Sequence, residues 1–217
     1  MDWLKQFLHQ VTDVETLVRV GGITAMTAIV FAETGLFVGF FLPGDSMLVT
    51  AGVFAAAGSL NLLHLNLVLI VAAIVGDTVG YWFGRKTGPA LFNRPRSRFF
   101  NPAHLRRAHD FYERHGGKTI VLARFMPIIR TFAPIVAGMA RMSYARFLSF
   151  NVFGGALWVL SMTLIGFFLG RIPGVREHIE LVILIVIFLS ILPGIVAFAK
   201  EWLRGRREHK TVLGKQA

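Results

Sequence analysis

Four ionisable side chains interrupt stretches of the sequence that are otherwise apolar: Glu33, Asp45, Arg124 and Arg130. An ionisable group inside a membrane is costly unless it is paired or hydrated, and such groups commonly mark functional sites. Each of the four is therefore a candidate functional residue. The alternative is that they form two structural salt bridges between segments, and the two interpretations are compatible.

These residue types suggest anion binding and proton transfer. The guanidinium group of an arginine is planar, stays charged and binds phosphate through two parallel hydrogen bonds. Arg124 and Arg130 are six residues apart, which suits a phosphomonoester or another anionic head group. A carboxyl group removed from water holds its proton more strongly, so Glu33 or Asp45 could take up and release protons. The combination predicts anion transport coupled to a proton gradient.

Three further polar or aromatic residues are weaker candidates. Asp77 is either a third proton site or a group that forms hydrogen bonds within the helix packing. Asn151 and Trp158 are seven residues apart, so they share one face of a helix. We expect these two residues to brace the broken hairpins rather than to contact substrate.

The sequence gives no indication of an enzyme, a metal site or a cofactor. It contains no cysteine, which excludes thiolate metal sites and thiol catalysis. The seven histidines fall in expected loops, tails or surface helices, without the spacing of metal ligands. Hydrolase, nucleotide-binding and zinc-protease motifs are not found.

The composition indicates a membrane protein that spans the bilayer several times. Of 217 residues, 54% are hydrophobic and 16% are charged, compared with about 25% charged residues in an average soluble domain. The net charge is nevertheless +11. The apolar residues occur in blocks with the basic residues between them, which argues against a soluble, disordered or collagen-like chain. A nucleic-acid interface would need base-reading residues on a soluble module, so we expect no nucleic-acid partner.

The blocks predict an all-α architecture with broken helices. A first repeat over 22–83 comprises a re-entrant hairpin and a transmembrane helix, and a second over 118–170 repeats that order. Prolines and glycines disrupt helices, and the expected breaks are at Pro43, Gly44, Pro127 and Pro134. For the first hairpin, a full crossing followed by a short helix is the alternative.

The remaining segments complete the expected membrane domain. Residues 1–20 have apolar positions at helical spacing, which predicts an amphipathic helix at the membrane surface. A last transmembrane helix is expected over 179–200. The connector 85–117 and the tail 201–217 are rich in Lys and Arg, which favours a cytoplasmic location for both, including the C-terminus.

A shift of 86 residues aligns the two halves of the chain. Seven identities, mostly glycines, relate 51–88 to 137–174. Each half contains one crossing, an odd number, so the second half starts on the opposite side of the membrane. This predicts an inverted repeat, which is typical of transporters. Within the first half, glycines spaced four apart form a ridge that allows close helix packing: Gly76, Gly80, Gly84 and Gly88.

Four motifs resemble those of the DedA family of bacterial inner-membrane proteins, which belongs to the VTT (SNARE-associated) superfamily. The first is the segment ETGLFVGFFLPGD at 33–45, and the second is GD…GY…G over 76–84. The third begins with Arg124-Phe125 and includes Arg130, and the fourth extends from Phe147 to Trp158. The resemblance extends over about residues 25 to 175.

The resemblance implies a bacterial inner-membrane protein and a fold shared with lipid scramblases of the endoplasmic reticulum. It also implies that Glu33, Asp45, Arg124 and Arg130 are required for function. Some DedA proteins are implicated in returning undecaprenyl phosphate across the inner membrane. We therefore expect a flippase for an anionic lipid. The alternatives are an uncoupled phospholipid scramblase, and a proton-coupled cation antiporter or membrane-homeostasis factor. Membrane lipids are the expected partners, and self-association is left open.

Overall fold

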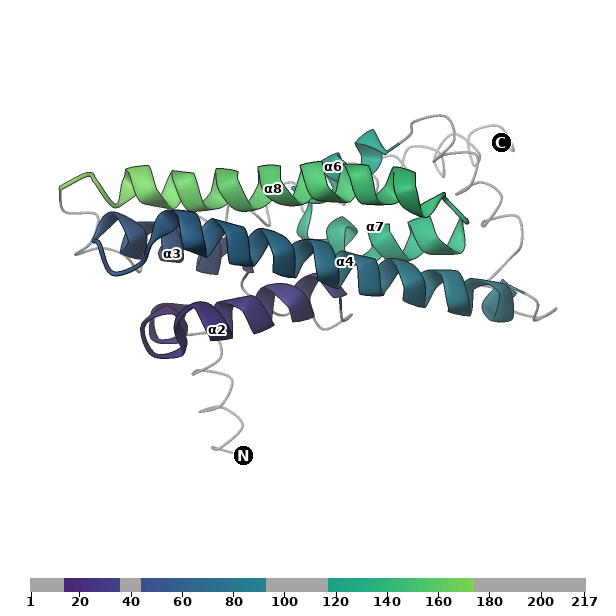
Figure 1. Ribbon diagram of the computed structural model, residues 1–217, viewed down its shortest axis with the longest axis horizontal. Coiled ribbons are helices and arrows are strands. Elements are labelled where there is room, and N and C mark those ends of the chain that lie inside the picture. The colour runs from purple at the N-terminus through teal and green to yellow at the C-terminus, as the bar shows by residue number, and fades with distance from the viewer. Residues whose placement is uncertain (1–13, 36–43, 93–116, 174–217) are drawn as a thin grey trace, which may run out of the picture.

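The computed structural model describes residues 14–35, 44–92 and 117–173 (Figure 1). All regular structure in these three ranges is helical, in agreement with the expected all-α class. The amphipathic helix up to residue 13, Pro43, most of the basic connector, the last transmembrane helix and the basic tail lie outside the described residues. Predictions about those segments stay predictions.

Two long helices dominate the described part of the chain. They are α4 (Leu62–Phe92) and α8 (Tyr144–Leu169). Their apolar stretches, Leu62–Gly88 and Tyr144–Leu169, have 27 and 26 residues. At a rise of about 1.5 Å per residue each is roughly 40 Å long, enough to cross a hydrocarbon core of about 30 Å.

Both long helices leave most of their apolar surface uncovered. Only 39% and 33% of the residues in their apolar windows are buried. A core helix of a soluble protein would be covered, and exposed apolar surface of this extent is typical of contact with lipid or a partner. The helix expected to cross the membrane over 62–83 is longer than predicted, because α4 continues to Phe92, within the segment assigned to the basic connector.

The shorter helices lie against the long ones. They are α2 (Val14–Gly35), α3 (Gly44–Ala56), α6 (Lys118–Ala123) and α7 (Pro127–Met139). A kink divides α2 at Gly22, where φ is 54° and ψ is −156°, a conformation open to glycine but rarely to other residues. The kink lies where the expected amphipathic segment gives way to the first repeat. The 13 residues after the kink span about 20 Å, less than the hydrocarbon core.

The expected breaks have different outcomes. α3 begins at Gly44, but the residues between Gly35 and Gly44 are outside the described ranges, so the first hairpin stays a prediction. α6 ends at Ala123, and α7 begins at Pro127 after the extended residue Met126. The break expected at Pro134 is wrong, because Pro134 lies inside α7. A helix packed among other helices can continue through a proline, and Pro134 lies against Gly80 of α4.

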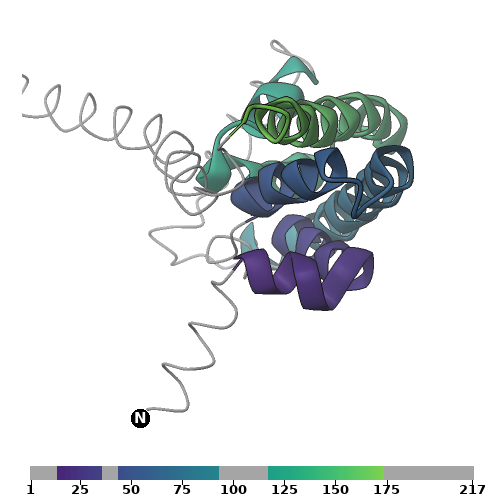
Figure 2. The same cartoon turned by 90° about the vertical axis from the view of Figure 1, so that its left-hand side faces the viewer.

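Two of the short helices, α3 and α7, each pack along the long helix of the other half. In Figure 1, α3 lies beside one half of α4 and α8, and α7 lies beside the other half. The end view in Figure 2 shows α3 and α4 between α8 on one side and α2 on the other. α3 runs along α8, and α7 runs along α4. The glycine ridge of α4 is a packing surface, as expected: a Cβ on Gly84 would overlap the Ile135 carbonyl.

Specific contacts follow the 86-residue repeat. Gly80 of α4 contacts Ile135 of α7, and Gly166 of α8 contacts Val49 of α3. The members of these two pairs are related by the same shift, since 166 − 80 = 86 and 135 − 49 = 86. These two contacts are thus related by the shift found in the sequence, and the inverted topology of the two halves stays a prediction.

Candidate functional site

The centre of the described structure contains an arginine held between two carboxylates. Arg130 of α7 donates to Asp45 in the first turn of α3, with an Nη1–Oδ1 distance of 2.6 Å. Its Nη2 donates to Glu33 of α2. All three side chains are buried. Hydrogen bonds between two charged groups are stronger than neutral ones, so Arg130 ties three helices together.

Trp158 of α8 completes this first network. Its indole Nε1 donates to Asp45 Oδ1 at 2.9 Å. The guanidinium carbon of Arg130 lies 4.7 Å from the centre of the Trp158 ring, which is the geometry of a cation–π contact. Trp158 thus contacts both members of one ion pair and fixes their relative position. We call Glu33, Asp45, Arg130 and Trp158 the central network.

Arg124 belongs to a second network. It follows α6 directly, and its Nη2 donates to Asp77 of α4 and to the side-chain oxygen of Asn151 of α8. The Asn151 amide in turn donates to the Ile74 carbonyl oxygen at 3.1 Å. These contacts hold the Asn151 oxygen toward the arginine. We call Arg124, Asp77 and Asn151 the second network.

The sequence-based candidates are therefore all in buried polar contacts, but in two groups. Arg124 and Arg130 have different carboxylate partners, although their spacing suggested one joint phosphate site. Asp77 ranked below the other acids in the sequence, yet it is the ion-pair partner of Arg124. Asn151 and Trp158 contact the charged groups directly, and their expected role in bracing the hairpins stays a prediction.

Several buried atoms of these networks have no hydrogen-bond partner among the described residues. They are Oε2 of Glu33 and the Nε atoms of Arg124 and Arg130. Glu33 Oε2 lies where a Cβ on Gly44 would be, so a glycine at the start of α3 leaves room for this carboxylate. Buried polar atoms are seldom left unpaired. The networks therefore keep donors and an acceptor available to water, a proton or a ligand.

A third buried polar pair was not identified from the sequence. The Thr163 hydroxyl of α8 lies 2.7 Å from Asn66 Oδ1 of α4. Thr163 follows Asn151 and Trp158 along α8, and Asn66 precedes Asp77 on α4. Neither residue is charged, so the hydropathy pattern of these helices gave no signal. The pair extends the polar interior beyond the central network.

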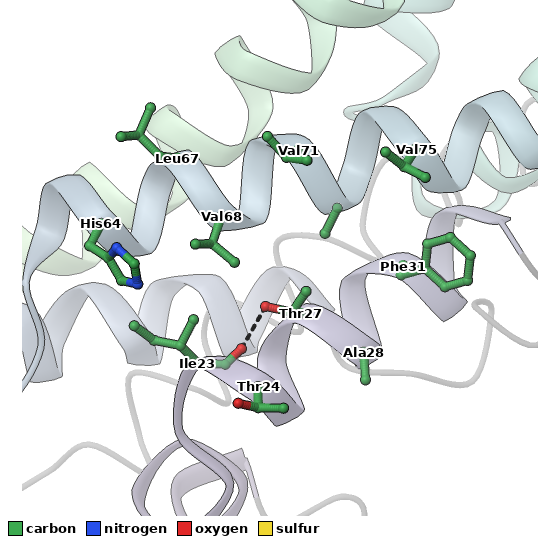
Figure 3. A pocket seen from close by; sticks show the side chains of 11 residues that line it. Ile23, Thr24, Thr27, Ala28, Phe31, His64, Leu67, Val68, Val71 and Val75 are labelled. Carbon is green, nitrogen blue, oxygen red and sulfur yellow. Dashed lines mark hydrogen bonds between the residues drawn. The ribbon is translucent and has the colours of Figure 1, made fainter.

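An apolar groove of about 890 Å³ lies between the facing sides of α2 and α4 (Figure 3). At one end, Thr24, Thr27 and His64 add polar atoms, and the Thr27 hydroxyl donates to the Ile23 carbonyl at 2.6 Å. The rest of the lining is apolar and includes Phe31, Leu67, Val68, Val71 and Val75. No charged residue of either network lines it. The groove suits hydrocarbon rather than the head group of a lipid.

The described residues contain no group of three or more His, Asp or Glu side chains that could hold a metal ion. The acids of the central and second networks face arginines instead. The described charged centre is thus made of ion pairs between carboxylates and arginines.

The model of the VTT domain family matches residues 42–168. Protein DedA of Escherichia coli K12 is 51% identical over 175 residues, which cover 80% of each chain. An uncharacterized membrane protein of Mycobacterium leprae is 42% identical, over 90% of this chain and 86% of its own. Inner membrane protein YqjA of E. coli is 37% identical, over 80% and 81%. No solved structure matches significantly.

Proposed function

Because the chain belongs to the DedA family of VTT-domain membrane proteins, we propose that it moves an anionic lipid head group across the membrane. Undecaprenyl phosphate is the first candidate, and the movement is driven by the proton gradient. In this proposal Arg130 and Arg124 bind the phosphate. Glu33 and Asp45 carry the protons, and Asp77 is a third candidate for that role.

The observation that carries the proposal is the pair of carboxylates on Arg130. The two Nη atoms of Arg130 each hold one carboxylate oxygen. They could instead hold two oxygens of one phosphate, because the donors of a guanidinium form a planar fork. The phosphate and the acids would compete for the same donors. Protonation of Glu33 or Asp45 would weaken its bond to Arg130 and release those donors.

The charge balance of the two networks supports proton coupling. Three carboxylates and two guanidinium groups give −3 + 2 = −1 when all are ionised. A buried site of net charge −1 repels another anion. Two protons on the carboxylates change the net charge to +1, which attracts a phosphate. Proton uptake would therefore precede or accompany anion binding.

The apolar groove gives independent support for a lipid substrate. A polyprenyl or acyl chain needs an apolar path while its head group is in the protein. The groove between α2 and α4 offers such a surface, and α2 also carries Glu33. We propose that the protein acts in the bacterial inner membrane with its C-terminus on the cytoplasmic side.

The test uses the full chain reconstituted into vesicles that contain labelled undecaprenyl phosphate, with and without a proton gradient. We expect transport that stops when the gradient collapses, and its loss in Glu33→Gln and Arg130→Ala. Arg171→Ala is the matched control, because Arg171 stacks on Phe167 and has no ion pair among the described residues. We expect this control to transport normally.

Other outcomes would favour the alternatives. Equal movement of labelled phospholipids without a gradient would favour a scramblase. Exchange of protons for sodium or potassium without lipid movement would favour a cation antiporter. Full activity of correctly inserted Glu33→Gln and Arg130→Ala variants would contradict the proposed roles of both residues.

A further inference from the structure

The two repeat halves end in related arginines with different surroundings. Arg85 of α4 and Arg171 after α8 differ by 86 positions, as do Tyr81 and Phe167. Each arginine lies over an aromatic ring: Arg85 Cζ is 5.7 Å from the centre of Trp82, and Arg171 Cζ is 4.4 Å from that of Phe167. The repeat therefore provides an internal comparison between the two ends.

The hydroxyl of Tyr81 has no counterpart on Phe167. It accepts a hydrogen bond from Arg85 Nη1 at 2.7 Å and donates to the Met142 carbonyl oxygen at 2.5 Å. Arg85 Nη1 is also 3.4 Å from that carbonyl oxygen. Met142 lies in the turn between α7 and α8. The hydroxyl thus holds the Arg85 guanidinium beside this turn. Both acceptors of Arg85, the Tyr81 hydroxyl and the Met142 carbonyl, are neutral, so these bonds do not neutralise the positive charge of Arg85.

The same turn contains a second arginine in an unusual conformation. Arg141 has φ 56°, and it is the one non-glycine residue with positive φ in the described ranges. Its N–H bonds the Gly138 carbonyl and that of Met142 bonds the Ala137 carbonyl, each at 3.1 Å. This is the Schellman ending of a helix, in which the second-to-last position is usually glycine. An arginine at this position costs backbone free energy relative to glycine. A contact made by its exposed side chain would account for arginine in place of glycine.

No acid balances this end of the described structure. The acids whose side chains are described are Glu33, Asp45 and Asp77, and all three are buried in the two networks. Trp82 is 43% exposed, and Arg85 and Arg141 are both exposed. The apolar part of α4 ends at Gly88, which places these side chains near one edge of the bilayer. Exposed tryptophan beside arginine at this level is typical of contact with lipid head groups.

We propose that Arg85, with the Trp82 ring beside it, and Arg141 bind the phosphate head group of an anionic phospholipid of the surrounding membrane. Tyr81 positions Arg85, and the Schellman turn positions Arg141. The site is separate from both buried networks, and it does not depend on the proposed transport function.

Arg141→Gly is the decisive variant, because glycine adopts a positive φ without strain. The full chain in detergent is titrated with phosphatidylglycerol or with zwitterionic phosphatidylcholine, and bound lipids are counted by native mass spectrometry. We expect the tightest phosphatidylglycerol binding to weaken about tenfold in Arg141→Gly, as for the loss of one charge-assisted contact. Arg141→Lys should bind within about twofold of the original chain, since lysine keeps the positive charge that attracts an anionic lipid. Phosphatidylcholine binding should not change.

The control is Arg171→Ala at the repeat-related end, which should bind phosphatidylglycerol as the unchanged chain does. Unchanged phosphatidylglycerol binding in Arg141→Gly would overturn the proposal, as would an equal loss in Arg171→Ala. The unfolding temperature of Arg141→Gly without lipid should equal or exceed that of the original chain. A lower value would also overturn the proposal, because the arginine side chain would then stabilise the fold itself.

Discussion

The pairing of Arg124 with Asp77 can be tested by a rescue experiment. Arg124→Met would leave the Asp77 carboxylate buried with no cation among its described contacts. Removing one member of a buried pair costs about 3–5 kcal/mol. One kcal/mol lowers the unfolding temperature of a chain of this size by about 2–4 °C. Arg124→Met should therefore unfold about 6–20 °C below the original chain.

Adding Asp77→Asn should restore much of that loss. The double variant is neutral and similar in shape, so no unpaired charge is left buried. We expect its unfolding temperature, measured by intrinsic fluorescence of the full chain in detergent, to lie above that of Arg124→Met alone. If Asp77→Asn lowers it further by its own separate amount, the pair does not exist in the folded protein.

A matched cycle with Arg171 controls for general effects of the Asp77 change. Asp77 lies in the middle of α4, whereas Arg171 follows the end of α8. Distant sites are additive within about 0.5 kcal/mol, which corresponds to about 1–2 °C. Asp77→Asn should therefore not rescue Arg171→Met. Rescue of both arginine variants alike would show that Asp77→Asn stabilises the chain for an unrelated reason.

Two further changes test the central network and the helix packing. Trp158→Phe keeps a ring near Arg130 but removes the hydrogen bond to Asp45. A hydrogen bond to a charged group contributes about 1.5–3 kcal/mol, so the unfolding temperature should fall by about 3–12 °C. An unchanged unfolding temperature would contradict that hydrogen bond. Gly52→Ala places a methyl group on the Thr163 carbonyl; overpacking of about 1–3 kcal/mol should lower the same temperature, whereas an unchanged value would show that α3 and α8 are not in contact there.

The sequence identified the charged residues but not their pairing. Glu33, Asp45, Arg124 and Arg130 are conspicuous because each interrupts an apolar segment. Which acid reaches which arginine depends on how the helices pack. Asp77 lies on the α4 ridge that the sequence assigned to packing, and it reaches Arg124 because α8 packs against both α4 and α6.

The helix ends show a similar division. The start of α7 at Pro127 agrees with the local rule that proline suits the first turn of a helix. A different rule, that an interior proline breaks a helix, gives the wrong answer at Pro134, where the packing of α7 on α4 preserves the helix. Local chemistry predicts where a helix starts, whereas tertiary contacts determine whether a proline in its interior ends it.

The repeat relates the scaffold of the two halves, but it does not relate their charges. Shifting by 86 residues places Thr131 on Asp45 and Thr163 on Asp77, and it places Gly44 on Arg130. The acids of the two networks thus come from the first half and the arginines from the second.

This asymmetry has a consequence for any movement of one half against the other. An exchange of conformations between the halves would bring helices into equivalent places, whereas the acids and arginines have no charged counterparts at the shifted positions. Each ion pair joins the two halves, so separating them exposes an acid in one half and an arginine in the other. A proton on the acid and an anion on the arginine are the ligands that would stabilise such a separated state.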